Sequence, residues 1–98
     1  FATVNQGSAK GWKKHTEMVL NLIVPVGEIK FVIYNKDLEE FYSVQLSQKN
    51  YQRLTIKPGL WVSFKGLGDT NILLNVASIE HNPTESVNVD LEDIDYEW

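Results

Sequence analysis

Apolar and polar residues alternate along much of this chain with a period of two, which is the spacing of β-strands rather than of helices. The clearest case is residues 28–34, whose odd positions are all large and apolar: Ile29, Phe31 and Ile33. The even positions, beginning with Lys30, fall on the opposite face. This pattern predicts a strand with one face turned toward a core.

Turn signals divide the neighbouring segments into further short strands. Residues 19–26 are an apolar run rich in branched side chains, and Gly27 closes it, so this run predicts a buried strand that enters the next one through a hairpin. Pro58 and Gly59 predict a tight turn. Other strands are expected at residues 41–46, 51–56, 60–64 and 71–77, separated by polar breaks at 35–37, 47–50 and 65–69. About seven short strands at roughly ten-residue spacing predict an all-β sandwich or small barrel.

The composition agrees with one small folded domain spanning residues 1–98. The chain is 43% hydrophobic and 22% charged, which is typical of a globular protein rather than a disordered one. It has no cysteine, which excludes disulfides, thiolate catalysis and thiolate metal sites. No apolar run approaches the ~20 residues of a membrane span, and no signal peptide is visible at the start. We therefore expect a cytoplasmic protein with no membrane partner.

The charge is distributed unevenly. Residues 1–84 carry nine bases and seven acids, whereas residues 85–98 carry six acids and no base. A nearly neutral body with scattered lysines argues against a nucleic-acid partner, which needs a concentrated basic face. The acidic segment at 85–98 is expected to be a solvated terminus, although the aromatics within 92–98 would allow a short stretch to dock.

Three stretches occur in an order that resembles a known family. Residues 10–15 read KGWKKH, residues 46–50 read LSQKN and residues 56–64 read IKPGLWVSF. Together they resemble the cupin-fold dTDP-4-dehydrorhamnose 3,5-epimerases, which read R-G-L-H, L-S-x-x-N and I-P-x-G-F-x-H-G-F, and the related ketoisomerases, which read R-G-x-H-A-H. Phe1 and Asn5 extend the match at one end, and Pro83 with Glu85 at the other. The resemblance implies a cupin jelly-roll barrel (a double-stranded β-helix) that binds a dTDP-sugar inside the barrel and needs no cofactor.

The acid–base groups of that family are replaced in this chain. The catalytic His of the family falls at Lys13, its Asp at Asn35, its Tyr at Asn75 and the His of H-G-F at Val62. Lys13 and His15 are two residues apart, so on a strand they share a face. Because an imidazole is the natural base near neutral pH, His15 is the candidate catalytic base, with Lys13 or an ordered water assisting.

The resemblance and the strand pattern also suggest residues that bind substrate. Lys10 stands at the family's Arg position and could contact a diphosphate as a point charge, with a solvated lysine as the alternative. Asparagines on or at the ends of apolar strands could bond a sugar, and strand-end capping is the alternative. The full expected set is Phe1, Asn5, Lys10, Asn21, Asn35 and Asn75.

Other conspicuous residues are assigned structural roles. Trp12 and Trp61 are expected in the core or at a dimer interface rather than stacked on a base, and His81 is expected to be structural. A metal site needs two or three His and an acid, but only His15, with Glu17 beside it, lies in the right region. No metal is expected.

Two functional hypotheses remain open. The first is an isomerase that epimerises or ketoisomerises a dTDP-4-keto-6-deoxy sugar for surface polysaccharide synthesis. The second is a non-catalytic cupin module that binds a sugar or sugar nucleotide. The asparagines at positions 35 and 75 favour the module, while the intact scaffold motifs favour the enzyme. The small size favours a homodimer in either case.

Overall fold

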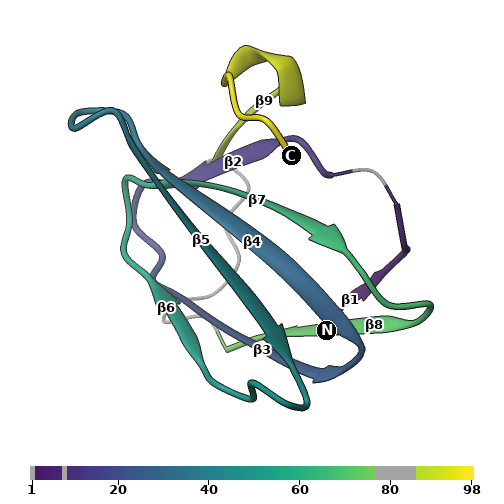
Figure 1. The fold of residues 1–98 in the computed structure, drawn as a ribbon. Helices are drawn as coiled ribbons and strands as arrows, with labels where there is room; N and C mark the ends of the chain where they lie inside the picture. The colour runs from purple at the N-terminus through teal and green to yellow at the C-terminus, as the bar shows by residue number, and fades with distance from the viewer. Residues whose placement is uncertain (1, 8, 77–85) are drawn as a thin grey trace.

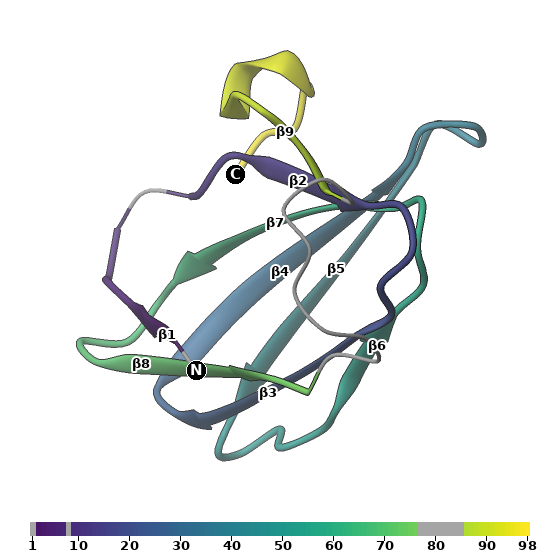
Figure 2. The ribbon, with the colours of Figure 1, turned by 180° about the vertical axis from the view of Figure 1, so that it is seen from behind.

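The computed structural model describes residues 2–7, 9–76 and 86–98, which form two antiparallel sheets that face each other (Figures 1 and 2). One sheet has the strand order β1 (Ala2–Val4), β8 (Asn71–Asn75), β3 (Leu20–Val26) and β6 (Leu54–Ile56). The other has the order β5 (Glu40–Ser47), β4 (Glu28–Asn35), β7 (Trp61–Gly66), β2 (Trp12–His15) and β9 (Ser86–Val89). The predicted all-β class is confirmed.

The strand β4 has the two faces that its alternation predicts. Ile29, Phe31 and Ile33 point between the sheets and join the main core, whereas Val32 packs on the outer face of the five-stranded sheet. Gly27 has a φ of +84° and makes the tight turn between β3 and β4. The predicted hairpin is therefore present.

The main core fills most of the space between the sheets. Its members come from both sheets, and several have no exposed surface or nearly none: Val24, Ile29, Phe31 and Leu46. Burying one such side chain stabilises the fold by roughly 1.5–3 kcal/mol, so these inward faces hold the two sheets together.

Asn71, at the start of β8, is fully buried, and its side chain makes four hydrogen bonds. Its side-chain oxygen accepts hydrogen bonds from the amides of Glu28 (2.9 Å) and Gly68 (3.1 Å). Its side-chain nitrogen donates to the carbonyls of Val4 (2.9 Å) and Gly68 (2.8 Å). A Cβ at Gly27 would lie only 2.3 Å from the Asn71 oxygen, so a glycine is required beside it. One amide thus links β1, β4 and the loop between β7 and β8.

The outer face of the five-stranded sheet is covered by the C-terminal segment, residues 91–98. Trp12 and Trp61 lie on this face and are 0% and 8% exposed, and the Trp12 indole donates to the Leu91 carbonyl (3.2 Å). The segment opens with a short 3₁₀ helix, Leu91–Asp93, and its apolar side chains pack on the sheet: Leu91, Ile94, Tyr96 and Trp98. The expectation of a fully solvated terminus is wrong for these residues, because the exposed acids alternate with apolar side chains that pack on the sheet.

The structure contains two short strands that the sequence analysis does not predict, β1 and β9, of three and four residues. The strand predicted at 51–56 is confined to Leu54–Ile56. Across the described ranges, no helix has the length and apolarity to cross a membrane. Four residues named above lie outside the described residues: Phe1, His81, Pro83 and Glu85.

Candidate functional site

A cavity of about 400 Å³ opens between the two sheets. Its walls are apolar, formed by Leu20, Leu22, Val62, Phe64 and Leu73. Its polar lining includes four side chains that can form hydrogen bonds: Lys13, His15, Asn75 and Asn88. An apolar pocket with a few polar groups is the usual form of a small-molecule site.

The alternation of β2 places its polar residues at this cavity. Trp12 packs on the outer face of the sheet, so the next residue, Lys13, lies on the opposite face, where it lines the open cavity while its side chain remains exposed to solvent. Lys13 lies opposite Val62 of β7 on one side and opposite Asn88 of β9 on the other. The inward position predicted for Lys13 and His15 follows from this register, because both residues line the cavity.

The neighbouring turn holds His15 in place at the end of β2. The Gly59 amide donates to the His15 carbonyl (2.7 Å), and Gly59 has a φ of +88°, as the predicted Pro58-Gly59 turn requires. His15 is partly buried. Two residues along a strand span about 6.6 Å, so the imidazole and the Lys13 amine can reach neighbouring atoms of one sugar ring.

The two amides come from different strands. Asn75 is the last residue of β8, and its side-chain oxygen accepts a hydrogen bond from the Asn21 amide (3.3 Å). Asn88 is on β9, directly opposite Lys13. The sequence analysis missed Asn88, although Val87 and Val89 alternate with Ser86 and Asn88, because an alternation over only four residues is too short to mark β9 as a strand.

Two predicted asparagines lie outside the cavity. Asn21 donates to the Val76 carbonyl (3.0 Å) and accepts from the Thr55 hydroxyl (2.9 Å), so its side chain links three segments of the four-stranded sheet. Asn35 accepts from the backbone amides of Asp37 (3.1 Å) and Leu38 (3.3 Å) in the β4–β5 turn. Asn35 therefore has the strand-end capping role that was the alternative prediction, whereas the Asn21 side chain bridges neighbouring segments of its sheet.

The remaining predicted residues are arranged as follows. Lys10 lines the cavity, is exposed, and its carbonyl accepts a hydrogen bond from the Ser63 hydroxyl. Asn5 is exposed and is not among the cavity residues, and Phe1 lies outside the described residues. Within residues 2–7, 9–76 and 86–98, no group of three metal-ligating side chains is found.

Two searches of known sequences return nothing: no protein-family model matches the chain, and no curated protein matches it. Solved structures do match. A dTDP-sugar isomerase from Desulfovibrio desulfuricans superposes with a TM-score of 0.87 at 30% identity, over 93% of this chain and 62% of that one.

Two other structures match at lower identity. The dTDP-4-dehydrorhamnose 3,5-epimerase of Sulfolobus tokodaii has a TM-score of 0.80 at 20% identity, over 97% of this chain and 58% of that one. The sugar 3,4-ketoisomerase QdtA of Thermoanaerobacterium thermosaccharolyticum, in complex with TDP, has a TM-score of 0.73 at 20% identity, over 88% and 63%.

This chain has the cupin fold. The two facing sheets are the halves of the jelly-roll barrel that the motifs at 10–15, 46–50 and 56–64 predict, and the cavity lies inside that barrel. The resemblance to cupin-fold sugar-nucleotide enzymes is confirmed at the level of structure. The cupin chain described here spans about three fifths of the length of these matches.

Proposed function

We propose that the barrel cavity binds a dTDP-4-keto-6-deoxy sugar and that the protein is an isomerase of sugar-nucleotide metabolism, serving surface polysaccharide synthesis. The observation that carries this proposal is the pairing of Lys13 with His15 on the inner wall of the cavity. The 30% identity to a dTDP-sugar isomerase supports the substrate class. A thymidine diphosphate would meet positive charge at Lys10, two residues before the start of β2.

The chemistry requires a base and a group that stabilises an enolate. A proton on the carbon beside a ketone is acidic enough for an imidazole to remove once the resulting negative oxygen is stabilised. In the proposed complex His15 takes this proton, and the Lys13 ammonium donates a hydrogen bond to the enolate oxygen. Asn75 and Asn88 bond sugar hydroxyls and fix the ring. An epimer forms when an ordered water delivers a proton to the opposite face of that carbon and His15 releases its proton to solvent. A shifted ketone forms when His15 returns its proton to the former carbonyl carbon while the proton of the adjacent hydroxyl passes to the enolate oxygen.

A specific observation favours binding without catalysis. Val62 and Asn75 occupy two positions where the family carries acid–base groups, and both line the cavity. Neither side chain transfers protons near neutral pH. The alternative function is therefore a cupin module that holds the sugar nucleotide without isomerising it.

Proton exchange distinguishes these two functions. The protein is incubated in D₂O with dTDP-4-keto-6-deoxyglucose, and deuterium at C3 and C5 is followed by NMR and mass spectrometry. The isomerase predicts protein-dependent exchange that His15→Gln lowers by about 100-fold or more. Binding measured by calorimetry without exchange supports the module, and neither binding nor exchange contradicts both.

The adjacent lysines on β2 provide a matched control. Lys13→Met removes the inward amine, whereas Lys14→Met removes one whose amine lies 5.0 Å from the Trp61 ring centre on the outer face. The proposal predicts that only Lys13→Met slows exchange. Equal losses in the two variants would mean that the effect is general destabilisation.

We also propose that residues 1–98 form a single cupin domain and that the protein acts in the cytoplasm as a homodimer. Support for the dimer comes from apolar side chains that remain exposed on the four-stranded sheet: Val26, Leu74 and Val76, at 37%, 37% and 55%. Light scattering on the purified chain tests this, and a monomeric mass at every concentration would contradict it.

A further inference from the structure

The outer face of the five-stranded sheet carries a second groove, separate from the barrel cavity. It has a volume of about 300 Å³ and lies between the β4–β5 turn and the C-terminal segment. Its aromatic wall comes from Tyr34, Phe41 and Trp61, and its acidic rim from Asp93 and Asp95. The proposed isomerase chemistry uses none of these five residues.

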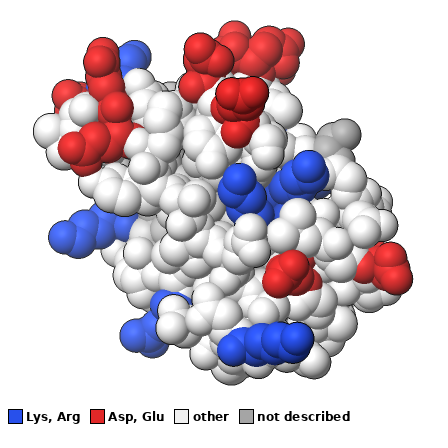
Figure 3. Space-filling view, viewed as in Figure 1, with Lys and Arg blue, Asp and Glu red and all other residues white. Residues whose placement is uncertain are grey.

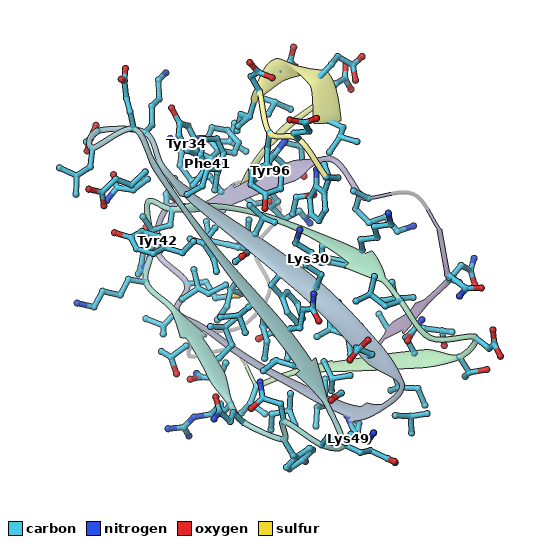
Figure 4. The ribbon with its side chains drawn as sticks, viewed as in Figure 1. Lys30, Tyr34, Phe41, Tyr42, Lys49 and Tyr96 are labelled. Atoms are coloured by element: carbon cyan, nitrogen blue, oxygen red, sulfur yellow. The ribbon has the colours of Figure 1, made fainter. Side chains whose placement is uncertain are left out.

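Two aromatic side chains of this groove stack on each other. The rings of Tyr34 and Phe41 are stacked, with centroids 4.4 Å apart and planes at 24°. Phe41 also contacts Tyr96 of the C-terminal segment, at 5.1 Å between centroids. Figure 4 shows Tyr34 and Phe41 together at the base of the β4–β5 turn, facing the segment that carries Tyr96. Phe41 remains 37% exposed, so this wall is accessible to a ligand.

Exposed carboxylates stand on both sides of the groove. Figure 3 shows red acidic side chains gathered over the β4–β5 turn and over the C-terminal segment. The exposed acids there are Asp37, Glu39 and Glu40 on one side, and Glu92, Asp93, Asp95 and Glu97 on the other. Among the described lining residues, Lys36 is the one base. These seven carboxylates outnumber the three lysines near this face, Lys14, Lys30 and Lys36, so the surroundings of the groove carry net negative charge.

Aromatic rings of this face already contact cations of the same chain. The Lys14 amine lies 5.0 Å from the Trp61 ring centre. The Lys30 amine lies 5.3 and 5.5 Å from the ring centres of Tyr96 and Trp98. Such contacts are favourable because a ring face carries negative charge density. The chemistry of this surface is thus suited to a further cation.

We propose that this groove is a docking site for an arginine-bearing basic segment of a partner protein. A guanidinium is planar and weakly hydrated, so it stacks on the Tyr34–Phe41 wall and forms paired hydrogen bonds with the carboxylates of Asp93 or Asp95. A lysine ammonium fits less well, because it is strongly hydrated and has no flat face. The site is independent of the barrel cavity.

The test uses defined tripeptides and two-dimensional ¹⁵N NMR of the full chain. The probe is acetyl-Gly-Arg-Gly-amide, and its matched control replaces arginine by the neutral isostere citrulline. We expect the arginine peptide to shift the Phe41 amide and the Trp61 indole signal with a dissociation constant of about a few millimolar, and citrulline to bind about fivefold or more weakly. Equal binding of the two peptides, or no shift at these signals, would overturn the proposal.

Variants of this chain distinguish a specific guanidinium site from a general attraction between the acidic surface and any cation. Asp93→Asn with Asp95→Asn should weaken arginine binding about fivefold, and Phe41→Leu by a similar factor, while Asp69→Asn, in the loop before β8, should not change it. A lysine peptide or spermidine that binds as tightly as the arginine peptide would overturn the assignment to arginine.

Discussion

Replacing Asn71 tests whether one buried amide holds three parts of the fold together. Asn71→Ala removes four hydrogen bonds, to Val4, Glu28 and twice to Gly68. At about 1 kcal/mol for each, the loss is about 4 kcal/mol, a large share of the ~5–15 kcal/mol that stabilises a typical domain. For a chain of 98 residues this corresponds to a fall in Tm of about 15–30 °C.

Urea unfolding followed by tryptophan fluorescence measures this change. The midpoint should fall while the slope stays constant, because the loss is in stability rather than in the surface exposed on unfolding. Asn50→Ala is the matched control, since its exposed side chain donates one hydrogen bond, to the Gln45 carbonyl (2.8 Å). It should cost less than about 1 kcal/mol. A loss below about 1 kcal/mol for Asn71→Ala would refute the reasoning.

The charge variant Asn71→Asp adds a pH dependence. Its second oxygen would face the carbonyls of Val4 and Gly68, to which the asparagine nitrogen now donates. Burial and these carbonyls would raise the pKa of the new carboxyl above the unfolded value of about 3.9. The protonated carboxyl therefore contributes fully to the free energy of unfolding below the unfolded pKa of about 3.9, and this contribution is lost as the pH rises through the higher folded pKa. Unchanged stability of this variant between pH 4 and pH 8 would contradict this.

Three further predictions concern single residues. In urea unfolding, Gly27→Ala should destabilise the protein by about 2 kcal/mol or more, and Gly59→Ala by about 1 kcal/mol. Both glycines have positive φ, but only at Gly27 would the new Cβ lie 2.2 Å from a backbone oxygen. Trp98→Ala should cost about 3 kcal/mol and increase binding of a hydrophobic dye, since it uncovers the outer aromatic cluster; unchanged dye binding would contradict the docked C-terminal segment. The hydrogen bond that the Tyr42 hydroxyl donates to Glu40 raises the pKa of Tyr42, and the negative charge of Glu40 raises this pKa further. Ultraviolet titration should therefore give a higher Tyr42 pKa in the unmodified protein than in Glu40→Gln. Equal Tyr42 pKa values in the two proteins would contradict this last account.

The longer strands could be predicted from the sequence, whereas the short strands at the two ends of the chain could not. β4 was predicted to within a residue, with the correct faces, because its three core positions, Ile29, Phe31 and Ile33, are all apolar and alternate with residues of the other face. β1 and β9 pair with neighbouring strands, and each contributes one valine, Val4 to the main core and Val89 to the outer cluster, but strands of three and four residues are too short for a pattern to be recognised. Their formation depends on tertiary structure, which local propensity does not report.

The candidate site was predicted in part for the same reason. Lys13 and His15 follow from strand alternation, so their inward direction could be inferred. Asn88 could not be found, because its contact with the cavity depends on a pairing between residues far apart in the chain. For Asn35 the sequence allowed two roles, binding a sugar or capping the end of its strand. The hydrogen bonds that its side chain accepts from the β4–β5 turn correspond to the capping role.

The most direct test of the central claim, that the barrel cavity binds a nucleotide-linked sugar, is ¹⁵N NMR mapping of dTDP binding to the full chain. We predict saturable shifts at the backbone signals of Lys13 and His15 and at the side-chain amides of Asn75 and Asn88, with little change at the Trp61 indole. Shifts confined to the outer face of the five-stranded sheet, or no saturable shift at millimolar dTDP, would contradict the claim.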